Sequence, residues 1–169
     1  MLETATLLFF PALMVFAAFS DLLTMTISNR VSIALTFLFI ALAIASGLTT
    51  AEISRHLASG ALILIVGFGL FAGGWIGGGD AKLAAATAIW LGFDHLGEYA
   101  LVASLLGGML TLLILGLRYW PVLDILTNHE WIKRLHEPDT GIPYGIALAS
   151  AGLLLYPESA IWLAAAASH

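Results

Sequence analysis

Residues 73–82 read GGWIGGGDAK and stand between two long apolar runs. The glycines leave the backbone free to bend or to approach another chain closely, and Asp80 follows them directly. A second aspartate, Asp21, stands at the end of another apolar run, in the stretch FSDLLTMTISN at residues 19–29. Charged side chains beside membrane segments are costly and usually mark function. The two aspartates are therefore the first candidates for a functional site.

The composition is that of an integral membrane protein. Of 169 residues, 60% are hydrophobic and only 10% are charged, with a mean hydropathy of +0.99, whereas a soluble domain carries about 25% charged residues. The lipid bilayer is therefore an expected partner. The chain has no cysteine, which excludes disulfides and thiolate metal sites. It has no basic cluster either, so no nucleic-acid partner is expected.

The apolar pattern predicts an all-α polytopic fold with six membrane-spanning helices in a single domain over residues 1–169. A spanning helix needs roughly 20 predominantly apolar residues, and the first segment is expected to be a mature helix rather than a signal peptide. The fourth is the shortest, with about 17 Å of uncharged helix between Lys82 and Asp94. The predicted helices cover residues 3–23, 30–48, 53–73, 80–96, 98–119 and 143–167, and a loop covers 120–142.

The number of crossings predicts which residues share a membrane face. Two apolar segments separate Asp21 from Asp80, so both carboxylates are expected at the same face. With six crossings, all Lys and Arg residues except Arg55 share that face. Because cytoplasmic loops carry the excess of Lys and Arg, the face is predicted to be cytoplasmic, with both termini outside. Within the loop, residues 131–135 predict a short interfacial helix.

Each aspartate has a structural interpretation as well as a functional one. Asp80 suits an N-cap of the fourth helix, and Asp21 suits a polar boundary. Together, two nearby carboxylates do not ionise twice and share one proton, as in an aspartic protease. Gly77, Gly78 and Gly79 would then permit positive φ or a close approach to substrate. The spacing of residues 69, 73 and 77, all glycines, favours close helix packing.

Three motifs in order resemble the type IV prepilin peptidases, or leader peptidases. GGGDAK at 77–82 is similar to their G-x-G-D-x-K element, Asp21 followed by ISN resembles their D…I-P-N loop, and PYGIALA at 143–149 resembles their P-Y/F-G-x-A helix start. The resemblance implies a GxGD-type aspartic endopeptidase without metal or cofactor, with Asp21 and Asp80 as the catalytic pair. It also implies cleavage of a basic leader from pilin-like precursors at the cytoplasmic (inner) membrane of a prokaryote.

This chain differs from the family pattern at two places. Ser28 stands where the family commonly has proline, and the insert with paired C-x-x-C motifs of the long members is missing. N-methylation of the trimmed pilin is therefore not expected of this polypeptide. The short form is similar to the peptidases of tight-adherence (Flp) pili and of some archaeal-type filaments.

Five further residues are candidates for supporting the site. Lys82 either anchors the fourth helix at the inner surface or tunes the dyad or a substrate acid. Asn29 either bonds to its loop or caps the second helix. Tyr144 and Gly145 are expected to line the cleft, and Pro143 suits the start of a helix. A capping box is predicted at the start of the third helix, from Thr49 and Glu52.

Other polar residues are assigned no chemistry. HEWIKRLHE at 129–137 is not the H-E-x-x-H of a zinc protease, because Lys133 stands where the second histidine belongs. No metal is expected there, although His129 and His136 are close enough in sequence to share a helical face. Residues 94, 95 and 98 are expected to form a plain polar turn without a partner cluster.

Two other classes of function stay open. Small bundles with intramembrane acids include proton-coupled transporters, although these more often place the acids at mid-membrane in paired repeats. The other is a non-catalytic membrane subunit of a pilus or secretion apparatus. A presenilin-type protease is disfavoured because Ser20, not tyrosine, precedes Asp21.

Overall fold

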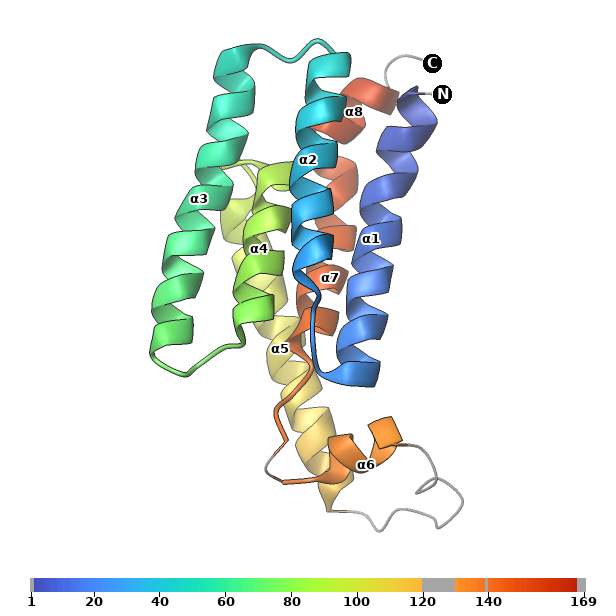
Figure 1. The fold of residues 1–169 in the computed structure, drawn as a ribbon, viewed down its shortest axis with the longest axis vertical. Coiled ribbons are helices and arrows are strands. Elements are labelled where there is room, and N and C mark those ends of the chain that lie inside the picture. Colours follow the sequence, from blue (N-terminus) through green and yellow to red (C-terminus); the bar gives the residue numbers. More distant parts are fainter. Residues whose placement is uncertain (1, 120–129, 139, 167–169) are drawn as a thin grey trace.

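The computed structural model describes residues 2–119, 130–138 and 140–166, and helices are the only regular elements in them. Figure 1 shows them as one elongated bundle. In chain order they are α1 (Leu2–Thr24), α2 (Asn29–Ala45), α3 (Thr50–Ala72), α4 (Gly78–Leu91), α5 (Leu96–Arg118), α6 (Glu130–His136), α7 (Tyr144–Leu155), the short 3₁₀ helix η1 (Tyr156–Glu158) and α8 (Ala160–Ala166).

Three helices are long and apolar enough to cross a membrane, over Thr6–Thr24, Thr50–Ala72 and Leu96–Arg118. The shorter apolar helix α2 has 17 residues. The fourth predicted segment, 80–96, is wrong at its far end, because α4 stops at Leu91 and has 14 residues. Gly92 ends it with a φ of 71°, a conformation that favours glycine. Six crossings therefore stay a prediction.

The last predicted helix, 143–167, is not continuous. It consists of α7, η1 and α8, because Pro157 has no N–H to continue a helical hydrogen-bond ladder. Ser159 follows the break, and its backbone N–H donates to the carbonyl of Tyr156 at 3.0 Å. The Ser159 hydroxyl oxygen then accepts from the N–H of Trp162 at 3.3 Å, in the first turn of α8. α6, by contrast, forms where the interfacial helix was predicted.

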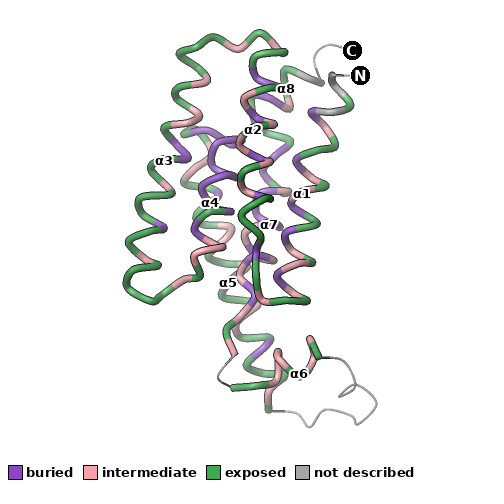
Figure 2. Tube along the Cα trace, viewed as in Figure 1, coloured by how far each residue is buried: buried purple, intermediate pink, exposed green. Residues whose placement is uncertain are grey.

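The core of the molecule lies around α4, which packs against α2, α3 and α7 and carries more of the buried residues seen in Figure 2 than any other described helix. Trp90 of α4 stacks at 5.0 Å from Phe10 and 5.8 Å from both Phe39 and Tyr156, measured between ring centroids. Its indole N–H donates to the Leu35 carbonyl at 3.0 Å. These rings join α1, α2, α4 and η1 into one core.

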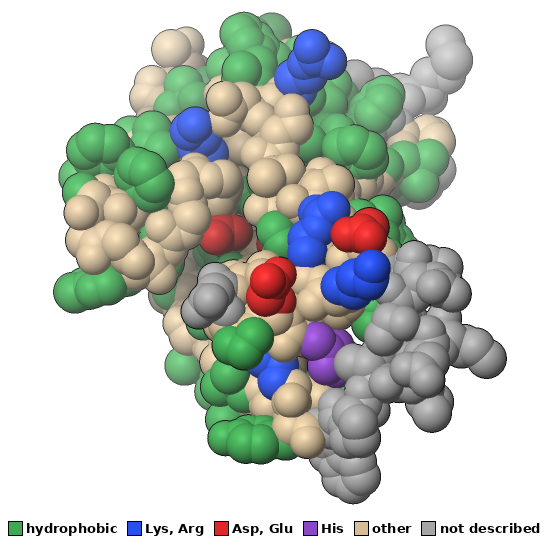
Figure 3. All heavy atoms as spheres, turned by 60° about the horizontal axis from the view of Figure 1, so that its bottom comes forward, with side chains coloured by type: hydrophobic (Ala, Val, Ile, Leu, Met, Phe, Trp, Pro, Cys, Tyr) green, Lys and Arg blue, Asp and Glu red, His purple; other side chains and the backbone are tan. Residues whose placement is uncertain are grey.

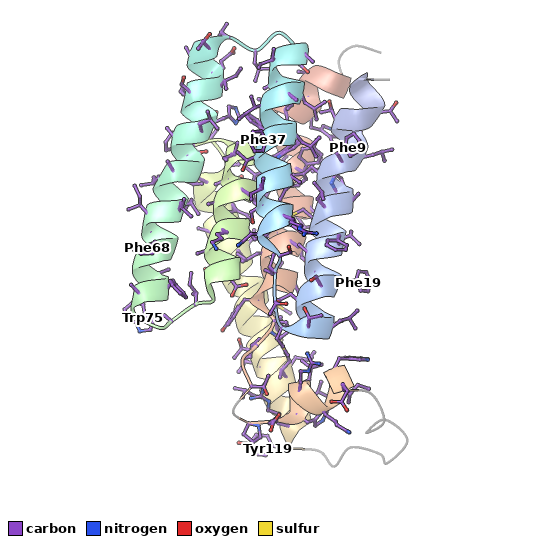
Figure 4. All side chains as sticks on the ribbon, in the orientation of Figure 1. Phe9, Phe19, Phe37, Phe68, Trp75 and Tyr119 are labelled. Carbon is purple, nitrogen blue, oxygen red and sulfur yellow. The ribbon has the colours of Figure 1, made fainter. Side chains whose placement is uncertain are left out.

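The outer surface of the bundle is apolar. Phe9, Phe37 and Phe68, from three different helices, point away from the bundle in Figure 4 and are exposed. A water-soluble protein rarely exposes so continuous an apolar surface. This surface is the one that lipid would cover.

Glycines bring α3 close to α4, but not at the positions that the spacing favoured. A Cβ at Gly60 would lie 2.9 Å from the Ala85 carbonyl, and one at Gly67 would lie 3.0 Å from the Ala81 Cβ. A Cβ at Gly69, in contrast, would meet no atom of the described residues within 4 Å, so its predicted role in packing on another described helix is wrong. The capping box at the start of α3 is confirmed, with Thr49 and Glu52 exchanging the expected hydrogen bonds.

Candidate active site

Asp21 lies in the last turn of α1 and is only 5% exposed. α1 ends just after it, where Met25 adopts a φ of 54° and its N–H still donates to the Asp21 carbonyl at 2.8 Å. The Asp21 carboxylate accepts a hydrogen bond from the backbone N–H of Gly145 at 2.7 Å. The first helix and the start of α7 are thus joined through this aspartate, 124 residues apart in the chain.

Asp80 is half-buried in the first turn of α4. It is not the N-cap that one interpretation assigned to it, because Gly77 holds that position. The Asp80 carboxylate instead turns back and accepts from the N–H of Gly77 at 3.2 Å. A Cβ at Gly77 would lie 2.7 Å from that carboxylate oxygen. The absence of a side chain at 77 therefore makes room for Asp80.

The other glycines of the motif act through contact rather than through positive φ. The residue with positive φ in this loop is Gly74, at 74°, and not one of Gly77, Gly78 and Gly79 as the motif suggested. A Cβ at Gly79 would lie 3.2 Å from the Cβ of Ile27. Gly79 is thus required by the close approach of α4 to the loop between α1 and α2.

Ile27 brings the two aspartates together. It is buried, it contacts Gly79 next to Asp80, and its Cδ1 would lie 2.7 Å from a Cβ on Gly145, the residue that bonds Asp21. The structure therefore places both carboxylates at one end of the bundle, where Figure 3 shows acidic and basic side chains gathered.

Lys82 and Asn29 bond to each other beside this pair. The Lys82 ammonium donates to the side-chain carbonyl of Asn29 at 2.8 Å, which ties the first turn of α4 to the first turn of α2. The predicted alternative of Asn29 as a cap is wrong, because Ser28 holds the N-cap and accepts from the N–H of Arg30 at 3.3 Å. Serine in place of the family's proline therefore supplies a helix cap.

Tyr144 fixes the start of α7 against α5. Its hydroxyl lies 3.0 Å from that of Thr111, and its ring occupies the space that a Cβ on Gly107 would enter, at 3.1 Å. Pro143 is the N-cap of α7 and is fully buried. The PYG motif thus orients the Gly145 N–H towards Asp21.

Arg118 supports the same region, although the sequence alone did not indicate this role. It ends α5, and its guanidinium donates to the carbonyls of Leu135 at 2.8 Å, Pro138 at 3.3 Å and Thr140 at 2.8 Å. These carbonyls belong to the segment that leads into Pro143. Because all three acceptors are backbone atoms, no sequence motif could have predicted these hydrogen bonds.

A cleft of about 470 Å³ opens beside Asp80, between α3, α4, α5 and α7. Asp80 and Tyr144 are among its lining residues, and most of the others are apolar or small. A second cleft, of about 500 Å³, lies between α2, α3 and α4 and includes Lys82 and Asn29. α4 therefore separates two clefts, and Asp80 lines only the first of them.

The family model of the type IV leader peptidases matches residues 8–114, a range that includes both aspartates and the glycine motif. The chain belongs to the type IV leader peptidase family. Membership of the leader peptidase family makes the chain a peptidase. Its three apolar helices of spanning length are those of a membrane protein. No curated protein and no solved structure gives a significant match to the chain. The resemblance seen in the motifs is thereby confirmed.

The polar turn at residues 94, 95 and 98 lies away from this site. At the far end of α4, His95 lies 3.2 Å from Glu98 and 3.9 Å from Glu158, so the turn has a partner cluster that was not expected. Both carboxylates are exposed, and exposed acids are often close together without a metal ion. His136 bonds its own helix, at the Ile132 carbonyl, while His129, Asp124 and Asp139 lie outside the described residues.

Proposed function

We propose that this chain is an aspartic endopeptidase that removes the leader from type IV pilin-like precursors. The observation that carries the proposal is that Ile27 contacts both Gly79, next to Asp80, and Gly145, which bonds Asp21, so that α1 and α4 bring the two aspartates to the same end of the bundle. Two carboxylates that share one site repel each other when both are charged, so in the proposed dyad one of them holds a proton. Such a pair supplies both a general base and a general acid for peptide hydrolysis.

The proposed reaction uses water held between the carboxylates. The ionised carboxylate takes a proton from the water, and the oxygen bonds to the scissile carbonyl carbon while the protonated carboxyl hydrogen-bonds the carbonyl oxygen. Collapse of the tetrahedral intermediate breaks the C–N bond, and the leaving amine receives a proton from the dyad. The Gly145 N–H holds the Asp21 carboxylate in place throughout.

The charge distribution supports cleavage at the cytoplasmic face. Lys82, Arg118 and Arg134 lie at the end of the bundle that holds the aspartates, with Arg134 bonded to the Leu23 carbonyl at 3.4 Å. Arg55 lies at the other end, paired with Asp94 at 3.8 Å. Because basic residues favour the cytoplasmic side, we expect the substrate's basic leader to be cut there. Six crossings and outer termini are part of this proposal.

The test is co-expression with a candidate pilin precursor, followed by mass measurement of its N-terminus. Asp21→Asn and Asp80→Asn keep the side-chain shapes but remove the acid–base chemistry, so each is expected to lower cleavage by at least about 100-fold. Asp94→Asn is the matched control, since Asp94 stands at the far end of α4 in an exposed pair, and it should cleave normally. Normal trimming by either dyad variant would refute the mechanism.

A further inference from the structure

The cleft beside Asp80 is formed by helices that do not close it themselves. α3 packs on α4 and α5 packs on α7, and these pairings far exceed any contact between α3 and α5 among the described residues. The floor between them is made of α4 and α7, with buried Ala81 and Ala147. The cleft is therefore a groove with two helical walls.

We propose that this groove receives the apolar helix of the precursor, directly after its leader. The inference rests on the proposed function, because the groove is identified as the substrate's by the carboxylate at its end. Asp80 is both a groove-lining residue and half of the proposed dyad. A helix in the groove would present the peptide bond that precedes it to the two aspartates.

The lining of the groove is suited to a helix rather than to separate lipid chains. Small residues from α3, α4 and α5, among them Gly67, Ala84, Ala103 and Gly108, face the space. Small residues allow two helix backbones to approach closely in a membrane. Along α5 the lining runs from Tyr99 to Gly108, which is about 13 Å of helix or more than two turns.

Tyr99 is a buried polar residue in the wall of this groove. It lines the groove and is 2% exposed, yet its hydroxyl makes no hydrogen bond of normal geometry to a described residue, although Thr87 is nearby. A buried hydroxyl without a partner is costly. The other cleft beside α4 has a comparable group, because Ser32 lines it and its hydroxyl also has no partner among the described residues. Asp80, which lines only the first cleft, is therefore what distinguishes the two.

A matched pair of glycines on α5 tests the groove. Gly108 lines it and Gly116 does not, and a Cβ at either would meet nothing within 4 Å. Leucine favours a helix more than glycine does, so Gly108→Leu and Gly116→Leu are both expected to fold. The substrate is a precursor with a short basic leader and an apolar helix of roughly 20 residues.

We expect Gly108→Leu to raise the KM for this precursor at least tenfold, with a smaller change in kcat, and Gly116→Leu to match the unsubstituted protein. Equal KM values for all three would overturn the inference. A second measurement does not depend on cleavage. In the Asp80→Asn protein, a photo-crosslinking residue at Ser104 in the groove should capture the precursor, and one at the lipid-facing Leu112 should not.

Crosslinking to lipid alone at position 104, or equal capture of the precursor at both positions, would also overturn the groove. The dyad mechanism and the docking groove can be refuted independently of each other. If Asp80→Asn still trims the precursor, the dyad mechanism is wrong, whereas capture at position 104 still identifies the groove as the docking site.

Discussion

Gly145 lies so close to Asp21 that its position has no room for a side chain. A Cβ there would lie 2.8 Å from the carboxylate oxygen and 2.7 Å from Ile27 Cδ1. Gly145→Ala should therefore displace Asp21 from Asp80, and a misplacement of about 1 Å can cost about 100-fold in rate. The rate of precursor cleavage by the purified protein measures the loss. Gly141→Ala is the control, because a Cβ there would meet no atom of the described part of the chain within 4 Å. Equal rates for both variants would contradict the role of Gly145.

At the scale of single residues, the sequence was informative where a side chain carries the function. Asp21 and Asp80 stood out because charge beside apolar runs is rare. The contacts that hold them were harder to predict. The Gly145 N–H and the carbonyls that bind Arg118 are backbone groups, which every residue except proline carries in the same form. Ile27 is one of many apolar residues, and only the fold shows that it contacts the glycines beside the two aspartates.

Among the elements, the segment that leads into α7 depends on Arg118. A single guanidinium holds three of its backbone carbonyls, and the segment continues to Gly145 and its bond to Asp21. Arg118→Gln should release this segment and lower kcat about tenfold, a loss of roughly 1.4 kcal/mol in transition-state stabilisation. Arg118→Lys should recover part of it, because lysine supplies one of the three contacts.

The control for Arg118 is Arg55→Gln, which breaks only an exposed pair at 3.8 Å and should leave kcat unchanged. The measurement is kcat and KM for the precursor, with thermal unfolding in detergent run in parallel. An Arg118→Gln protein with normal kcat would show that the segment keeps its place without the guanidinium.

The existence of the long helices could be predicted from apolar length alone, and α1, α3 and α5 lie where the pattern put them. Helix ends were less predictable. α4 ends at Leu91, before the predicted end at residue 96, because Gly92 adopts a φ of 71° and stops the helix. Pro157 likewise divides the last segment through its backbone, because it has no N–H to donate. A bilayer tolerates such a broken helix where neighbouring helices satisfy its backbone groups.

For the whole molecule, the orientation in the membrane is open to a direct test. The chain has no cysteine, so single introduced cysteines report their side without background. Ser54 is exposed near the start of α3, at the end away from the aspartates, and Lys133 is exposed on α6. Basic residues at the aspartate end predict that this end is inside.

A membrane-impermeant maleimide added to intact cells should therefore label Ser54→Cys, and should label Lys133→Cys only after the cells are opened. Both variants replace polar, exposed residues, so neither is expected to disturb folding. Labelling of Lys133→Cys in intact cells would place the aspartates outside and would exclude a cytoplasmic site.

The start of α1 and the final helix α8 lie at the same end of the bundle in Figure 1, where the Tyr156 hydroxyl bonds the Thr6 carbonyl. A short peptide linker from the end of α8 to the start of α1 would therefore not need to pass through lipid. The chain is thus suited to circular permutation, with new ends opened in the polar turn between α2 and α3 on that same side. Such a circularly permuted variant would keep every helix in its present direction across the membrane.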